Sequence, residues 1–251
     1  MIVAGFILLA VGAADLVRQF APRRWIGYLT VAVTLLLLGS VGDALLPMLI
    51  SLVVGALWVW GMPADRPAPL GFWPAVLLGV LCIGAVVFVE ARADAGLIGS
   101  VWQLRSPFGE VPFDLAMLTL GAGVFLLESS NLVVRAALDG EHTWRPTLSP
   151  DESAAPKSAA TDEPAVADTG DGFKGGRLIG PLERILVLIL TLAMAYPILA
   201  AMLAAKGIVR FPEISRDGKT GARAEYFLVG SLVSWVIALG SAFLVWWAAH
   251  S

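Results

Sequence analysis

The chain has 251 residues, a formal net charge of −3 and a mean hydropathy of +0.81, and 58% of its residues are hydrophobic. The net acidic charge excludes a nucleic-acid partner, which requires a strongly basic face, and the single cysteine, Cys82, excludes an intrachain disulfide. Soluble domains average about 45–50% apolar residues, so the composition indicates an integral membrane protein.

Seven long apolar segments account for this hydropathy. A helix needs about 20 largely apolar residues to cross the hydrocarbon core of a bilayer. The runs are continuous and do not alternate, so they indicate helices and not the strands of a barrel. We therefore predict an all-α, polytopic membrane bundle of about seven transmembrane helices. The segments cover residues 2–20, 25–41, 44–62, 72–91, 112–138, 178–208 and 224–250.

The first segment resembles a secretory signal peptide in its apolar core. However, no lysine or arginine precedes that core, and Asp15 and Arg18 follow it. This is the wrong charge order for a cleaved signal. We expect a retained first helix.

Two stretches between the apolar segments have a different character. Residues 92–111 are too polar to span, and we expect a surface-lying amphipathic segment or a loop packed on the bundle. Residues 139–175 are rich in Pro, Ala, Ser, Thr and acidic side chains, a composition that predicts a disordered linker. The linker divides a five-helix block, residues 1–138, from a two-helix block, residues 176–251.

The sixth segment, residues 178–208, contains Pro197 near its middle, and proline removes a backbone donor and kinks a helix. We expect a single span, and a broken or re-entrant helix is the alternative. The choice matters for membrane orientation. A single span places the basic residues of 206–223 on the opposite side from most other arginines, whereas the positive-inside rule expects them together. The sequence leaves the orientation open.

A candidate polar site lies at the end of the fifth segment and the start of the sixth. Residues three, four or seven apart share one helix face, so Glu128, Asn131 and Arg135 line the same face. Arg177 and Arg184 share a face of the sixth segment, with Glu183 beside it. Charged residues are costly at membrane depth and are retained when they are paired, hydrated or functional. Glu128 and Glu183 are the strongest candidates for an interior role, because glutamate is too short to reach the headgroups from inside a span.

Charged residues also surround the loop before the last segment. These residues are Lys206, Arg210, Glu213 and Glu225.

Charges at the last turn of a span commonly extend to the lipid headgroups. We expect this behaviour from five charged residues that lie near predicted helix ends. These residues are Asp15, Arg18, Arg135, Lys206 and Arg210.

Small residues recur every four positions in the last two segments, from Gly230 to Ala242 and from Ala193 to Ala205. Such seams let membrane helices approach closely. We therefore predict that these two segments pack on each other through their small-residue faces.

Three strings at residues 175–235 together resemble a known sequence signature. They are GRLIGPLER, AAKGIVRF and AEYFLVGSLVS. The signature has the pattern GRxIGxLER, AAKxIxRF and EYFxxGSLxS, and it is found near the C-terminus of bacterial multi-pass membrane proteins of uncharacterised function. The resemblance covers about a quarter of the chain and implies a multi-pass protein of the bacterial inner (cytoplasmic) membrane. The matching positions are Gly176, Arg177, Gly180, Glu183, Arg184, Lys206, Arg210, Glu225, Tyr226, Gly230 and Ser234.

The sequence offers little for catalysis. The two histidines, His142 and His250, lie outside the predicted spans, so we expect no haem, no metal site and no cofactor. There is no nucleophile elbow and no phosphate-binding loop, and we assign no catalytic residue.

Three functions remain open. The one we favour is a non-catalytic accessory or assembly subunit of a membrane complex, with membrane lipids and another membrane protein as partners. The alternatives are a small transporter with an intramembrane Glu/Arg route and a membrane enzyme acting on a lipid-linked substrate.

Overall fold

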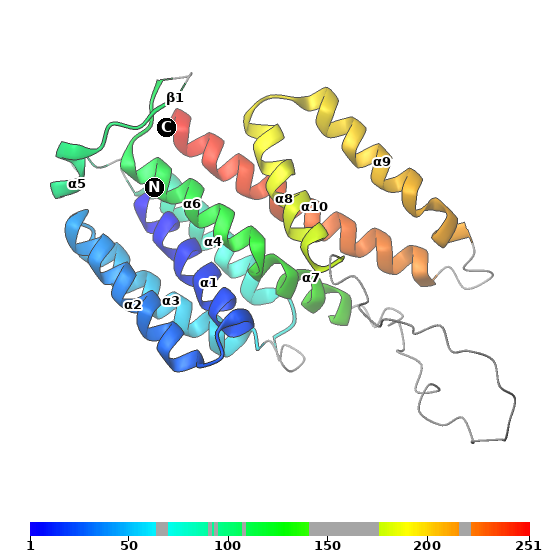
Figure 1. Ribbon diagram of the computed structural model, residues 1–251, viewed down its shortest axis with the longest axis horizontal. Coiled ribbons are helices and arrows are strands. Elements are labelled where there is room, and N and C mark those ends of the chain that lie inside the picture. The colour runs from blue at the N-terminus through cyan, green and yellow to red at the C-terminus, as the bar shows by residue number, and fades with distance from the viewer. Residues whose placement is uncertain (64–69, 90–91, 93–94, 107–108, 141–175, 216–221) are drawn as a thin grey trace, which may run out of the picture.

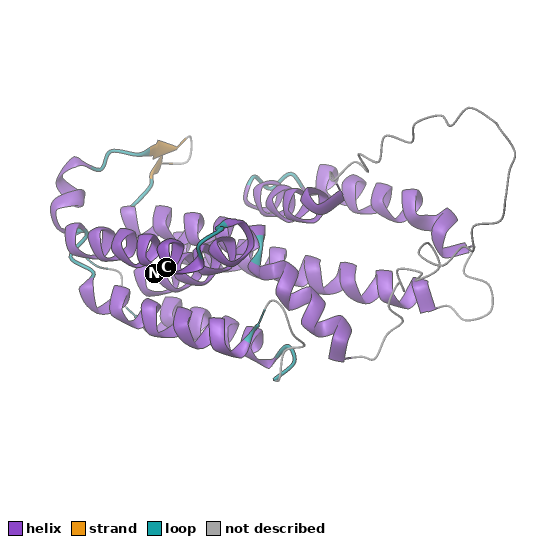
Figure 2. Ribbon diagram, turned by 60° about the horizontal axis from the view of Figure 1, so that its bottom comes forward, coloured by secondary structure: helices purple, strands orange, loops and turns teal. Residues whose placement is uncertain are grey.

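The computed structural model describes residues 1–63, 70–89, 92, 95–106, 109–140, 176–215 and 222–251. Helices make up nearly all of the described chain (Figures 1 and 2), which confirms the predicted all-α architecture. The helices are α1 (Ile2–Phe20), α2 (Arg24–Val41), α3 (Leu45–Gly61), α4 (Trp73–Phe88), α5 (Gly96–Val101), α6 (Phe113–Leu127), α7 (Ser129–Gly140), α8 (Gly176–Leu192), α9 (Tyr196–Ser215) and α10 (Ala222–His250).

The segment between α4 and α6, for which we left two alternatives open, is a short helix followed by a small ribbon. Two-residue strands, β1 (Arg105–Ser106) and β2 (Gly109–Glu110), pair antiparallel after α5. The indole of Trp102 donates to the carbonyl of Val111, 2.8 Å away, and its ring packs edge-on against Phe113. These contacts hold the segment against the start of α6. The predicted linker, residues 139–175, lies outside the described residues from position 141 onward.

Helix α1 is the centre of the bundle and packs against α2, α3, α4 and α6 (Figure 1). Its closest neighbour is α6, and the two helices run parallel. Gly5 lies against the backbone of Leu118 and Gly12 against that of Phe125. A Cβ at Gly12 would lie only 2.7 Å from the backbone nitrogen of Phe125. Glycine is therefore required here to let the two backbones meet.

The fifth predicted segment is two helices. Helix α6 ends at Leu127, α7 starts at Ser129, and the two are bent by 49° at this break. Glu128 lies at the break with φ −126° and ψ −41°.

The sixth predicted segment is also two helices, so the expected single span is wrong. The chain turns at residues 193–195, where Met194 has a φ of +56°. Pro197 is not the break. It lies in the first turn of α9, where its missing N–H would have had no partner in any case. A salt bridge joins Glu183 in α8 to Lys206 in α9, which shows that the two helices form an antiparallel hairpin.

The bundle has two ends, and charge is distributed unequally between them. The Met1 end contains Met1, Arg92 and Asp114, which line one pocket, and both chain termini lie there (Figure 1). The Arg18 end contains Arg18, Arg24, Glu128 and Tyr226. The α8–α9 hairpin leaves from and returns to the Arg18 end, so α10 also begins at this end.

Several helices suit a membrane. Among the described residues, α1, α2 and α10 are long and apolar enough to cross one, and the bent pair α6–α7 adds a fourth if it counts as a single span. Helices α3 and α4 are apolar but shorter, as is the described apolar part of α9, Tyr196–Val209. The predicted all-helical architecture is therefore confirmed, and three or four candidate spans agree with a membrane protein, whereas seven spans are not confirmed.

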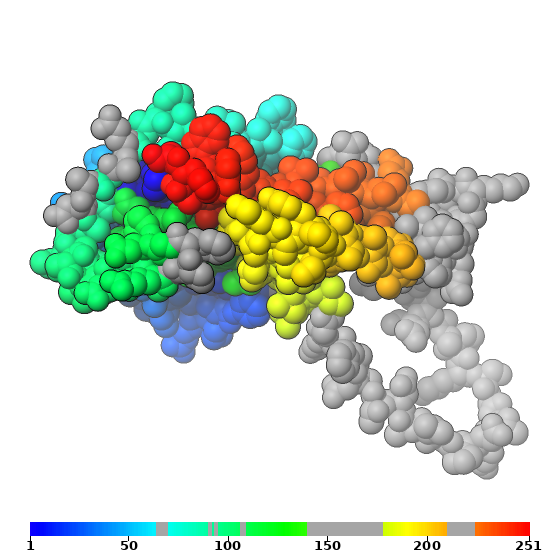
Figure 3. Space-filling model, turned by 90° about the horizontal axis from the view of Figure 1, so that it is seen from above, coloured from blue at the N-terminus to red at the C-terminus, as the bar shows by residue number. Residues whose placement is uncertain are grey.

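The small-residue seam of α10 is buried, but its partner is not the one we predicted. Ala238 and Ala242 are fully buried, and α10 packs against α8, α7, α6 and α4. Ala201 and Ala205 of the other seam are exposed. The hairpin turn carries α9 outward, and Val187 and Leu188 of α8 are buried in the core instead. Figure 3 shows α10 beside the α8–α9 hairpin on one face of the molecule.

Candidate functional site

The break between α6 and α7 is the origin of the candidate site. A helix end leaves backbone carbonyls without an intrahelical partner, and such groups are costly at membrane depth. The Ser130 hydroxyl donates to the carbonyl of Leu126 at 2.8 Å, and the Asn131 amide nitrogen lies 3.4 Å from the carbonyl of Leu127. Side chains from the first turn of α7 therefore bind the carbonyls that the break releases.

Arg184 of α8 donates further hydrogen bonds to the groups at this break. Its Nε donates to the carbonyl of Leu126 at 3.2 Å, and its guanidinium also donates to Oδ1 of Asn131. Asn131 in turn donates to a carboxylate oxygen of Glu128 at 3.2 Å. Arg184 is 3% exposed and Glu128 is 7% exposed. The structure thus brings together three of the six predicted polar-site residues in one buried network.

Glu183 belongs to a different cluster. Nζ of Lys206 lies 2.7 Å from both of its carboxylate oxygens, and the indole of Trp235 donates to Oε1 at 3.0 Å. The ammonium also lies over the rings of Trp235 and Phe227, 5.6 and 5.9 Å from their centroids, in cation–π contact. This cluster links the α8–α9 hairpin to α10.

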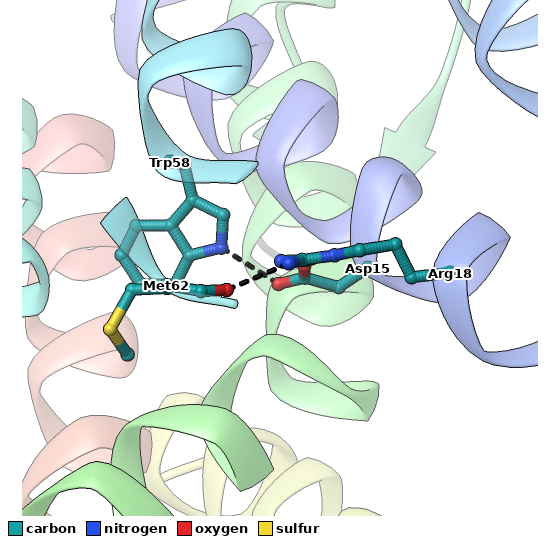
Figure 4. A network of polar contacts seen from close by, with 4 residues as sticks. All are labelled: Asp15, Arg18, Trp58 and Met62. Atoms are coloured by element: carbon teal, nitrogen blue, oxygen red, sulfur yellow. Dashed lines mark hydrogen bonds and ion pairs between the residues drawn. The ribbon is translucent and has the colours of Figure 1, made fainter. Parts of the chain in front are cut away.

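A third cluster involves Asp15 and Arg18, which we expected to reach the headgroups. The structure shows that this expectation is wrong, because Asp15 is 1% exposed. Figure 4 shows the arrangement: the Arg18 guanidinium pairs with Asp15 and donates to the carbonyl of Met62 at 2.7 Å, while the indole of Trp58 donates to Asp15 at 2.9 Å. The cluster binds the end of α1 to the end of α3.

A fourth cluster, at the Met1 end, was missed by the sequence analysis. Arg92 forms a bidentate salt bridge with Asp114, at 2.6 and 3.1 Å, and donates to the carbonyls of Gly42 and Asp43. Asp114 could have been noticed in the sequence, because a carboxylate in the first turn of a helix interacts favourably with the helix dipole. Its partner, Arg92, lies 22 residues away, and no local sequence pattern indicates that the two residues pair.

A hollow of about 480 Å³ opens at the Arg18 end between α1, α7 and α10. It is lined by Glu128 at the break and by Asn131 and Arg135 on α7, together with Gln19 and Tyr226. Arg135 is exposed there. The predicted face of Glu128, Asn131 and Arg135 therefore borders one open, polar space.

Four predicted residues remain, and the structure describes the side chain of one of them. Glu225 is exposed in the first turn of α10. Arg177, Arg210 and Glu213 have helical backbones, but their side chains lie outside the described part of the structure.

Three arginines share one chemical role. Arg18, Arg92 and Arg184 each donate to a carbonyl at the end of another helix and to an oxygen of an Asp or Asn side chain. Arginine suits this role because its planar guanidinium offers several donors in a fixed geometry. Within the described residues, no group of three or more His, Cys, Asp or Glu side chains could hold a metal ion.

Comparison of the chain with protein-family models, with curated proteins and with solved structures finds no match.

Proposed function

We propose that this chain is a non-catalytic, multi-pass subunit of a membrane assembly in the bacterial inner membrane, in which the buried charges join helices. The observation that carries this proposal is the environment of Glu183. Its carboxylate pairs with Lys206 and Trp235 of neighbouring helices, an arrangement suited to structure and not to an open ion route.

The packing between the two ends of the bundle supports the same proposal. The core between them is apolar and includes Ile7, Val11, Leu118 and Ala122, all fully buried. The glycine contacts leave no space between α1 and α6. The polar groups at the Arg18 end and at the Met1 end are therefore separated by apolar side chains.

We place the Arg18 end on the cytoplasmic side. Of the lysine and arginine side chains that the structure describes, Arg92 and Arg105 lie at the Met1 end, and all others lie at or near the Arg18 end. The positive-inside rule assigns the more basic side to the cytoplasm. The resemblance of residues 175–235 to bacterial multi-pass proteins supports the choice of membrane.

A transporter is the second candidate, and the hollow lined by Glu128 and Arg135 favours it. It would require that space to connect with the opposite side during a conformational change, as in proteins that alternate access around a broken helix.

One pair of measurements separates the two. The purified full chain is reconstituted into vesicles, and proton and potassium flux are followed with entrapped dyes. In parallel, native membranes are solubilised gently and the size of the assembly that contains the chain is measured. We expect no flux above that of protein-free vesicles and an assembly larger than the purified chain. Flux that Glu128→Gln abolishes, with an unchanged folded yield, would establish the transporter instead.

Glu183→Gln gives a second test of the structural role. We expect the yield of folded protein to fall, because Lys206 then lacks its counter-charge. An unchanged yield would contradict a structural role for this salt bridge.

A further inference from the structure

A groove between α1, α2 and α3 belongs to none of the polar clusters. It holds about 310 Å³ and is lined mainly by small or apolar side chains, among them Ala10 and Ala14 of α1, Ala32 of α2, and Gly55 and Ala56 of α3. The geometry points to this groove as the site of one acyl chain of an anionic phospholipid whose phosphate lies against Arg23 and Arg24.

Close contacts hold α2 near both of its ends, and Leu35 is buried in the core between them. Near its start, Gly27 fits against Val17 of α1, and a Cβ there would lie 2.5 Å from the valine methyl group. Near its end, Gly39 fits against Met48 of α3, where a Cβ would lie 2.7 Å from the methionine Cβ. Between these contacts the small side chains do not fill the space. Elsewhere such residues bring helices together, but here they leave a hollow at membrane depth.

The polarity of the groove changes along α2. Arg24, Tyr28, Val31 and Leu35 are spaced four, three and four residues apart, so they share one helix face. From Tyr28 onward this face lines the groove over about 10 Å of helix. Arg24 precedes it by one turn, and it is exposed, as is Arg23. The same face therefore offers an apolar channel and, at its Arg18 end, cationic side chains.

The surroundings of Tyr28 favour an anionic headgroup. Two cations, Arg18 and Arg24, and one anion, Asp15, interact electrostatically with its phenol, and the first turn of α2 contains no acidic residue. Trp25, 68% exposed, marks the level of the membrane interface. A negatively charged phosphate at this level would meet two arginines and the phenol hydroxyl, while its acyl chain would fill the groove. A zwitterionic headgroup would add a cation to a site that is already basic.

The inference does not depend on the proposed function. A subunit and a transporter could both hold such a lipid, and Glu128, Glu183 and their partners take no part in it.

The test uses the purified full chain in nanodiscs that contain equal amounts of phosphatidylglycerol and phosphatidylcholine with identical acyl chains. Native mass spectrometry then counts the lipids that remain bound after release from the disc. We expect one retained phosphatidylglycerol per chain. Removing the charge in Arg23→Gln/Arg24→Gln should reduce the preference for phosphatidylglycerol by about five-fold per arginine. Arg135→Gln, which removes an exposed arginine elsewhere at the Arg18 end, should leave it unchanged.

A second variant tests the acyl channel. Ala32→Phe fills the groove and should abolish retention of either lipid. Val33→Phe adds the same side chain on the exposed face of α2 and should retain the lipid. Added glycerol phosphate should not displace the bound molecule, because the headgroup alone lacks the acyl contact.

Three results would overturn the inference. They are equal retention of the two lipids by the unmodified chain, a preference that Arg135→Gln removes while Arg23→Gln/Arg24→Gln does not, and a retained lipid in folded Ala32→Phe. If Ala32→Phe does not fold, the arginine variants decide the matter, since Arg23 and Arg24 are both exposed.

Discussion

Arg184 donates its Nε–H to the carbonyl of Leu126, 3.2 Å away, across 58 residues of sequence. The contact joins α8 to the end of α6 at the point where that helix breaks. The buried guanidinium thereby gains an acceptor, and the carbonyl, which also accepts from the Ser130 hydroxyl, gains a second donor. A guanidinium without such acceptors would be costly at this depth.

We predict that Arg184→Met destabilises the protein by about 3 kcal/mol, because it leaves the Leu126 carbonyl and the Asn131 amide oxygen short of a donor. Thermal unfolding in detergent, followed by tryptophan fluorescence, measures the change. Arg135→Met is the matched control, since Arg135 is exposed on α7, and it should change stability by less than about 0.5 kcal/mol. Equal effects of the two substitutions would contradict the capping role.

The sequence could predict that Glu128 and Asn131 lie together but not what they meet. Their spacing of three residues is a local property of a helix. The arrival of Arg184 depends on a hairpin, and the turn of that hairpin, Ala193–Met194–Ala195, contains neither glycine nor proline. Pro197 indicated the region of the break but not the residues that form it. Proline disrupts the interior of a helix, but it is accepted in the first turn, which is where Pro197 lies in α9.

Asp15 illustrates the same limit. A charge near the end of an apolar segment predicts contact with headgroups, and nothing near Asp15 in the sequence indicates that Trp58, 43 residues away, covers it. Burial of this carboxylate is decided by how α3 packs on α1. That packing is a tertiary property.

The bond between Trp58 and Asp15 leads to a second prediction. Trp58→Phe keeps an aromatic ring near Phe125, with which Trp58 packs edge-on, but removes the indole donor. We expect a loss of about 1–2 kcal/mol in unfolding free energy, because a buried carboxylate loses a hydrogen bond. Trp60→Phe is the control on the same helix, as Trp60 is 78% exposed. A loss no larger than that of Trp60→Phe would show that the bond contributes nothing.

The contact of α1 with α6 leads to a third prediction. Gly12→Ala should destabilise the protein by more than about 2 kcal/mol, since its methyl group would lie 2.7 Å from the backbone nitrogen of Phe125 and force the helices apart. Gly123→Ala, in α6 itself, meets no atom within 4 Å and should be neutral or slightly stabilising. Unfolding midpoints of the two variants in the same detergent provide the comparison. Similar midpoints would mean that the two helices do not pack as closely as described.

The α8–α9 hairpin makes a fourth prediction, about the sides of the membrane. Lys206 pairs with Glu183 near the middle of both helices, so the start of α8 and the end of α9 must lie at the same end of the bundle. Cysteines that replace Arg24, Arg135 and Glu225 in turn should therefore all react with an impermeant maleimide from one side of sealed vesicles. A cysteine in place of Gln103 or Glu110 should react from the other side.

The native Cys82 is buried and should not react with the maleimide. Its replacement by serine ensures that any labelling comes from the introduced cysteine. The comparison is sharpest at Glu225. If residues 178–208 formed one continuous span, α10 would start on the opposite side from Arg24, and Glu225 would label together with Gln103. If cysteines in place of Glu225 and of Arg24 are labelled from the same side of the membrane, residues 178–208 must form the hairpin.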